Sequence, residues 1–261
     1  MSNKLRKILI CGLGSIGRRY LRILNKNWPD LKIAVLRSGF GYSCDEIKLI
    51  DYQTSNLGDS IDWGPEAAII SSPASLHVEQ AITLGNSKVP CLIEKPLGTG
   101  YEDYGKLDKL IQISESLPIH IGYILRHDPC SIFIKEKLKK NLLGRVVEAD
   151  FHCGSWLPKW RPNIDYLKSV SASKELGGGA LLELSHDIDI ANWLLGPIKL
   201  NYANLQSSGL LPIDVEDRAI LVGENSNGAH ISIRINFCSS IYYCIYCRLY
   251  NLFGIYKPLF C

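Results

Sequence analysis

The sequence predicts an α/β protein, with a Rossmann-type parallel sheet domain followed by an α+β domain that has an open, mostly antiparallel sheet. Up to residue 122, short apolar runs alternate with helical segments, which is typical of right-handed crossover units and a parallel sheet. Near the C-terminus, strand-like segments follow one another without helices between them, which indicates antiparallel pairing. We therefore expect two domains, residues 1–122 and 123–261.

The first strand and helix carry the most informative motif. The apolar run Ile8–Cys11 predicts a strand buried on both faces, and it ends at Gly12, Gly14 and Gly17, spaced G-x-G-x-x-G. Gly12 allows a tight turn, Gly14 lets a pyrophosphate approach the backbone, and Gly17 lets the helix Ser15–Asn25 pack closely. The alternative is a glycine turn without a ligand, but the strand before it and the helix after it favour a dinucleotide site.

The predicted choice between NADP(H) and NAD(H) depends on Arg37. It follows the second predicted strand, Leu31–Leu36, about 20 residues past the glycines. An acid at this place accepts a hydrogen bond from the ribose 2′-hydroxyl, whereas an arginine favours a 2′-phosphate. With Ser38 as a second donor, the sequence favours NADP(H) over NAD(H), and the alternative is a solvated arginine on a loop.

Three more strands complete the predicted parallel sheet, at Ala67–Ser71, Val89–Ile93 and Ile119–Ile124, with helices at about 75–84 and 99–116. Ligands of such sheets bind at the carboxyl ends of the strands. The residues expected to bind the cofactor at these ends are Gly12, Gly14, Ser15, Ile16, Gly17, Arg37, Ser38, Ser72, Pro73, His77, Glu94 and Lys95.

The second half combines helices with strands. A helix is expected at Ile132–Asn141, and three glycines at 177–179 open a long helix, Ala180–Leu195, which Gly196 and Pro197 terminate. The predicted strands of the second sheet are Arg145–His152, Lys199–Gln206, Ala219–Gly223 and His230–Phe237.

Four residues have the chemistry of an acid–base site. Lys95, at the end of a strand, can polarise a hydroxyl or carbonyl and stabilise negative charge on its oxygen. Glu183, His186 and Asp189 share one side of the long predicted helix; His186 can move a proton and a carboxylate can orient it. The alternative is a hydrogen-bonded core histidine. We therefore predict Lys95, His186, Glu183 and Asp189 as catalytic.

These motifs resemble the glucose-fructose oxidoreductase, inositol dehydrogenase and MocA family. The resemblance rests on the glycine motif, on Glu94 to Leu97, and on the stretch from Gly177 to Asp189, over residues 5 to about 237. It implies a nicotinamide-binding Rossmann domain, then an α+β domain that holds the substrate and supports oligomers. It also implies that Lys95 and His186 match the family's catalytic lysine and histidine. The family's usual acid precedes the histidine by four residues, whereas Glu183 precedes it by three.

The loop from Trp160 to Tyr166 is similar to a subgroup associated with surface-polysaccharide and nonulosonic-acid sugar pathways. By that resemblance, Arg161, Tyr166 and Lys168 are expected to hold hydroxyls, a carboxylate or a phosphate of a sugar. The residues alone leave open a structural arginine stacked on Trp160. Tyr123 and Arg126, which follow the last strand of the first domain, are further substrate candidates.

Composition limits the partners. The net charge of +3 comes without a basic block, which disfavours nucleic-acid binding. The N-terminus runs directly into the first strand without a signal peptide, so we expect a cytoplasmic protein without membrane contact. The nine cysteines are scattered, and Cys11 and Cys91 lie in apolar runs as small hydrophobic residues. No metal is expected, because Cys244 and Cys247 have no second ligand pair.

The segment from Cys238 to Cys261 differs in composition from the rest, with many cysteines and tyrosines and two charged residues. One hypothesis is a chain that leaves its ancestral reading frame near Phe237 and ends early, which would leave the second sheet short of strands. The principal functional hypothesis is an NAD(P)-dependent oxidoreductase that moves hydride to or from a secondary alcohol or ketone of a sugar, as a homo-oligomer if the C-terminal sheet forms. The alternatives are an inactive dinucleotide-binding remnant and a dinucleotide sensor.

Overall fold

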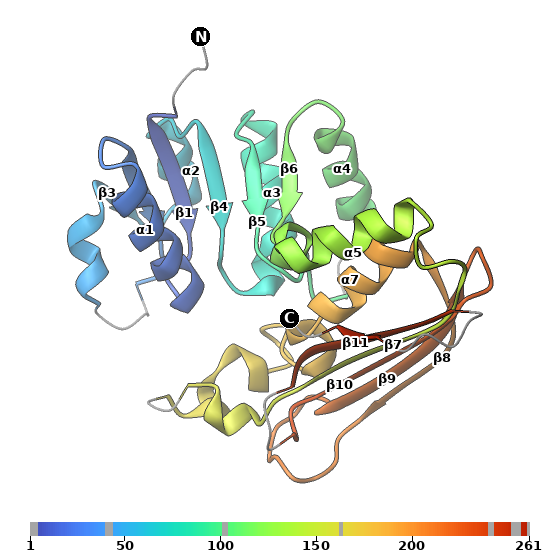
Figure 1. Ribbon diagram of the computed structural model, residues 1–261. Helices are drawn as coiled ribbons and strands as arrows, with labels where there is room; N and C mark the ends of the chain where they lie inside the picture. Colours follow the sequence, from blue (N-terminus) through green and yellow to red (C-terminus); the bar gives the residue numbers. More distant parts are fainter. Residues whose placement is uncertain are drawn as a thin grey trace. The chain divides into compact units, whose positions relative to one another are not determined.

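The computed structural model describes residues 5–39, 44–100, 104–161, 164–239, 243–251 and 257–259, the last two ranges as backbone only (Figure 1). The described residues form two compact units, one within Met1–Gly122 and one within Tyr123–Cys261. Each unit has its own sheet and its own hydrophobic core.

The first unit is a parallel sheet with strand order β3-β2-β1-β4-β5-β6, which confirms the predicted Rossmann-type domain. Chain order reverses between β1 and β4, so the ends of these two strands lie side by side. Its strands are β1 Lys7–Cys11, β2 Lys32–Leu36, β3 Tyr52–Thr54, β4 Ala67–Ile70, β5 Cys91–Ile93 and β6 Ile119–Ile121. Its helices are α1 Ser15–Asn27, α2 Leu57–Asp62, α3 His77–Asn86 and α4 Tyr104–Ser114.

Both faces of this sheet are covered, which explains the unbroken apolar run of β1. Ile8 and Ile10 pack on the face that α1 covers, beside Leu21. Leu9 and Cys11 pack on the opposite face, beside residues of α3 and α4. In Figure 1, α1 accordingly lies in front of the sheet, and α2 and α3 lie behind it.

The second unit has strand order β12-β11-β7-β10-β9-β8, in which only β7 and β10 are parallel among the described strands. This confirms the predicted α+β architecture. Its strands are β7 Val146–Gly154, β8 Ile198–Gln206, β9 Arg218–Asn225, β10 His230–Asn236, β11 Tyr243–Asn251 and β12 Lys257–Leu259. Its helices are α5 Pro129–Lys139, α6 Ala180–Glu183 and α7 His186–Leu195, and α5 and α7 pack on one face around Phe151 and Ile233.

The prediction of one long helix over Ala180–Leu195 is wrong, because the helix is interrupted between α6 and α7. The amide of Ser185 bonds to Leu182 and the amide of Asp187 bonds to Leu184, so the backbone tightens to i→i−3 bonds at this point. No glycine or proline marks the break, and the apolar periodicity continues through it. The predicted strand Ile119–Ile124 is too long, since a 3-10 helix occupies Ile124–His127.

The segment after Phe237 adds strands to the second sheet. The backbone of β11 pairs antiparallel with β7, and β12 pairs with β11. The side chains of Cys244 and Cys247 lie outside the described part of the chain. Among the described residues, no group of acids, histidines and cysteines is arranged to hold a metal ion. None of the helices described here is long and apolar enough to cross a membrane.

The packing of the second core gives a stability prediction. Phe151 is completely buried beneath α7, whereas Phe133 on α5 is 58% exposed. Replacing Phe151 by Ala is expected to lower the free energy of unfolding by about 3–5 kcal/mol, because it leaves a cavity. Urea unfolding followed by circular dichroism measures this loss. Phe133→Ala is the control, and an equal loss for both variants would contradict the described core.

Candidate active site

The turn after β1 accepts only glycine at two positions. Gly12 has φ +91°, and a Cβ atom there would lie 2.7 Å from the backbone of Ser72. A Cβ atom on Gly17 would lie 2.1 Å from the carbonyl oxygen of Gly12. The Ser71 hydroxyl donates to the carbonyl oxygens of Cys11 and Gly12, at 3.1 and 3.0 Å. The backbone of β1 therefore packs directly against the backbones of α1 and of the end of β4.

Gly14 has a different reason to be glycine. A Cβ atom there would meet no protein atom within 4 Å, so the space above it is open. The amides of Ser15, Ile16 and Gly17 precede the first described i→i−4 bond of α1, from Arg18 to Gly14. Open space over a helix N-terminus with available N–H groups suits a pyrophosphate, so these residues fit a dinucleotide.

Arg37 and Ser38 lie directly after β2, where the sequence predicts the contact to the adenosine ribose. The amide of Arg37 donates to the carbonyl oxygen of Thr54 at 3.0 Å, which fixes its backbone to the end of β3. Arg37 is half-buried and Ser38 is exposed.

The segment Glu94, Lys95 and Pro96 follows β5. The Tyr20 hydroxyl donates to Glu94 Oε1 at 2.6 Å, and burial together with this hydrogen bond raises the pKa of Tyr20. His77 is buried, with Nδ1 2.8 Å from the carbonyl oxygen of Pro96 and Nε2 2.8 Å from that of Ser72. The predicted direct contact of His77 with the cofactor does not fit this geometry, because backbone carbonyls take both ring nitrogens.

His186 is the first residue of α7, and the ring of Tyr123 lies edge-on to it with ring centroids 5.8 Å apart. Arg126 donates to both carboxylate oxygens of Asp189, with Nε 2.8 Å from Oδ2. The guanidinium also lies 5.8 Å from the centroid of the Tyr123 ring. Arg126 and Asp189, predicted separately as a substrate ligand and a catalytic acid, thus form an ion pair beside Tyr123.

Glu183 accepts a hydrogen bond from the Ser171 hydroxyl at 2.8 Å. Because the helix is interrupted between α6 and α7, Glu183 and His186 do not share one side of a continuous helix. The preceding glycines allow close approach, since a Cβ atom on Gly179 would lie 2.4 Å from the Glu216 carboxylate. Glu216, which sequence reasoning missed, accepts from the Leu181 amide at 2.9 Å and fixes the start of α6.

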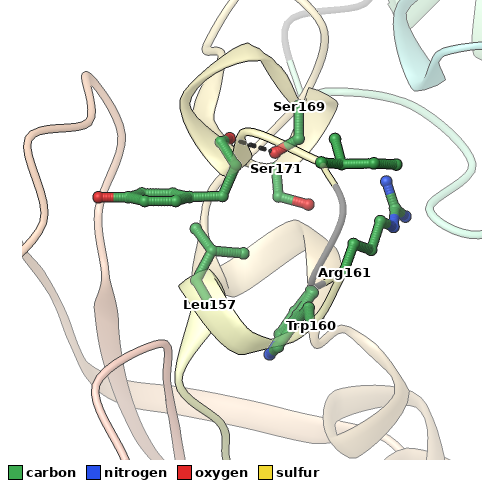
Figure 2. Close-up of a pocket in the computed structure, with 7 residues that line it drawn as sticks. Leu157, Trp160, Arg161, Ser169 and Ser171 are labelled. Carbon is green, nitrogen blue, oxygen red and sulfur yellow. Dashed lines mark hydrogen bonds between the residues drawn. The ribbon is translucent and has the colours of Figure 1, made fainter.

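A small hollow, open to solvent, lies in the second unit over the loop after β7 (Figure 2). Arg161 and Tyr166, both predicted substrate ligands, line it, whereas Lys168 is not among its lining residues. The Trp160 indole donates to Ser155 at 2.8 Å, and its ring packs edge-on against Phe237. The remaining lining residues are Leu157, Trp160, Ile164, Ser169 and Ser171, and Ser171 connects the hollow to Glu183.

Asp187 is a buried carboxyl group that sequence reasoning missed. It is 1% exposed, and its Oδ1 has no hydrogen-bond partner among the described residues. Burial raises its pKa to about 7, and a hydrogen bond with Cys153 acts in the opposite direction. Its position directly after His186 places a titratable group at the start of α7.

The parallel sheet and its glycine turn define a dinucleotide-binding protein of the Rossmann class. Residues 6–122 match the oxidoreductase family with an NAD-binding Rossmann fold, and residues 132–253 match the GFO/IDH/MocA C-terminal domain. The chain belongs to the GFO/IDH/MocA family.

Named relatives are enzymes of carbohydrate and polyol chemistry. The chain is 27% identical to inositol 2-dehydrogenase 2 of Saccharopolyspora erythraea, over 87% of this chain and 65% of that protein. It is 24% identical to 2,7-anhydro-N-acetylneuraminate hydratase of Mediterraneibacter gnavus, over 72% of this chain and 48% of that protein. It therefore spans less than two thirds of the length of these two relatives.

The fold matches a crystal structure of the WlbA dehydrogenase from Bordetella pertussis in complex with NADH and UDP-GlcNAcA. The TM-score is 0.78 at 17% identity, over 95% of this chain and 72% of that chain. At this identity the match shows the fold alone.

The raised pKa of Asp187 gives a pH prediction. Because its pKa is about 7 in the folded protein against 3.8 for the ordinary group, the folded state binds more protons between these values, and stability falls as pH rises through them. Asp187→Asn removes this dependence. The free energy of unfolding of the Asp187→Asn variant should therefore exceed that of the wild type, and the difference should be largest above pH 7 and smaller toward pH 4. Urea unfolding at a series of pH values measures this difference. A difference that does not change with pH would contradict a buried, titrating Asp187.

Proposed function

We propose that the protein is an NAD(P)-dependent oxidoreductase that transfers hydride to or from a secondary alcohol or ketone of a sugar or sugar derivative. The observation that carries this proposal is the open space over Gly14 at the N-terminus of α1, in a chain that matches both domains of the GFO/IDH/MocA family. The two relatives above are named as enzymes, so they give no support to an inactive remnant.

The cofactor would be held at the carboxyl ends of the first sheet. The turn at Gly12 and Gly14 with the amides of Ser15 and Ile16 would receive the pyrophosphate. We further propose that Arg37 and Ser38 bind a 2′-phosphate, so the site would favour NADP(H) over NAD(H). The remaining proposed contacts are Gly17, Ser72, Pro73, Glu94 and Lys95.

Proton and charge movements would be divided between two residues. A bound nicotinamide accepts or supplies the hydride. Lys95 would stabilise negative charge on the reacting oxygen, and His186 would take the hydroxyl proton in oxidation or return it in reduction. Glu183 or Asp189 would orient the ring of His186. Arg126 holds the carboxylate of Asp189 in place.

For the substrate we propose a sugar derivative with an anionic group, of the kind found in surface-polysaccharide or nonulosonic-acid metabolism. Arg161 lines the open hollow, and a guanidinium is suited to a carboxylate or phosphate. Tyr166, Tyr123, Arg126 and Lys168 are the further proposed substrate ligands. A relative named as a hydratase of an anhydro-neuraminate and a similar fold solved with UDP-GlcNAcA support this substrate class.

We further propose a cytoplasmic homo-oligomer. Cys11 and Cys91 are buried and carry free thiols, which suits a reducing compartment. On β8, the side chains of Leu200, Tyr202 and Leu205 are about half exposed, which gives the second sheet apolar surface for contact between copies.

The role of His186 is testable by substitution. His186→Ala should lower turnover by about 10²- to 10⁴-fold, because proton transfer is lost. Binding of NADH, followed by its fluorescence, should stay nearly unchanged. Turnover would be measured on the best substrate from a panel of inositols, UDP-sugars and nonulosonic acids. His230→Ala, an exposed histidine of the same unit, is the control, and unchanged turnover in His186→Ala would refute the assignment.

The cofactor preference has its own test. Arg37→Ala should weaken NADPH binding by about 10- to 100-fold, because a charged hydrogen bond to the 2′-phosphate is lost. NADH binding should change little. A fluorescence titration with both cofactors measures the two dissociation constants. A wild-type protein that binds NADH more tightly than NADPH would overturn the proposed preference.

A further inference from the structure

We propose that Tyr20 and His77 are positioning residues that fix the segment carrying Lys95 from the two faces of the first sheet. The proposal rests on the role assigned to Lys95 above. Neither residue is expected to touch substrate. Their hydrogen bonds instead hold Glu94 and Pro96, the neighbours of Lys95 on either side.

The first anchor comes from α1. The hydroxyl of Tyr20 donates to Glu94 Oε1 at 2.6 Å, and Oε2 of the same carboxylate lies 3.3 Å from the amide of Lys95. Gly122 leaves room for this carboxylate, since a Cβ atom there would lie 3.2 Å from Glu94 Oε1. Because contact between Gly17 and Gly12 fixes α1, the position of Tyr20 is tied to the glycine turn.

The second anchor comes from α3. His77 is 2% exposed, and its two ring nitrogens lie 2.8 Å from the carbonyl oxygens of Pro96 and Ser72. A neutral imidazole has one N–H and can donate to one of these oxygens, whereas a protonated imidazole donates to both. In either form the ring bridges the chain after β4 and the chain after β5.

The two anchors reach the segment from opposite faces of the sheet. The face with α1 contains Tyr20, and the face with α3 contains the residues around His77 (Figure 1). The chain after β5 has no regular secondary structure through Gly98 to hold it. Hydrogen bonds to Glu94 and Pro96 therefore fix the chain on both sides of Lys95. A catalytic lysine needs such support, because its ammonium group must be held in a defined position.

A hydroxyl deletion tests the first anchor. In Tyr20→Phe, amide hydrogen exchange of Lys95 and Leu97 should accelerate about tenfold, as expected for one lost hydrogen bond. The turnover number should fall by a similar factor while KM for substrate, the NADH dissociation constant and the melting temperature stay near those of the control. The control is Tyr52→Phe, because Tyr52 is a partly buried tyrosine of the same unit that stacks on Trp63.

Two amide replacements test the second anchor. The amide nitrogen of Asn can take the place of His77 Nδ1 toward Pro96, and that of Gln the place of Nε2 toward Ser72. His77→Asn should therefore leave the exchange of the Lys95 and Leu97 amides near the wild-type rate, whereas His77→Gln should accelerate it. Equal exchange in the two variants, or unchanged exchange in Tyr20→Phe, would overturn the proposal. Exchange is measured without substrate, so a protein that shows no turnover refutes the proposed function and not this inference.

Discussion

The contact between Gly17 and Gly12 is the constraint on which the first unit depends. A Cβ atom at Gly17 would lie 2.1 Å from a backbone oxygen, so only two glycines allow α1 to start this close to β1. That closeness brings the N-terminus of α1 to the end of β4 and leaves the space above Gly14 open. It also sets where Tyr20 meets Glu94. The proposed cofactor site and the position of Lys95 thus have one structural origin.

The three acidic residues next to His186 in the sequence have different surroundings. Asp189 is paired with Arg126, whose guanidinium donates to both of its carboxylate oxygens. Asp187 is buried with a pKa of about 7, so it is partly neutral near that pH. Glu183 accepts a hydrogen bond from Ser171, which lines the open hollow. Carboxylates close together in sequence can in this way serve separate tasks.

Local patterns of the sequence predicted much of the fold. The glycine spacing and the buried strand Ile8–Cys11 identified the first turn, because both depend on neighbouring residues. The break at Ser185 escaped prediction, because the apolar periodicity runs through it without glycine or proline. The pairing of Arg126 with Asp189 spans 63 residues, and that of Glu216 with Leu181 spans 35, so both depend on tertiary structure. The same holds for the two carbonyl contacts that bury His77.

A cofactor titration of the wild type and of Gly14→Val tests the central claim most directly. A Cβ atom at this position meets no protein atom within 4 Å, and the residue has an allowed φ of −71°. The fold and melting temperature should therefore be preserved while the valine side chain fills the space for the pyrophosphate. We expect NADPH or NADH to bind the wild type and raise its melting temperature, and to bind Gly14→Val at least about 100-fold more weakly. Equal binding by both proteins would contradict a dinucleotide site at this turn.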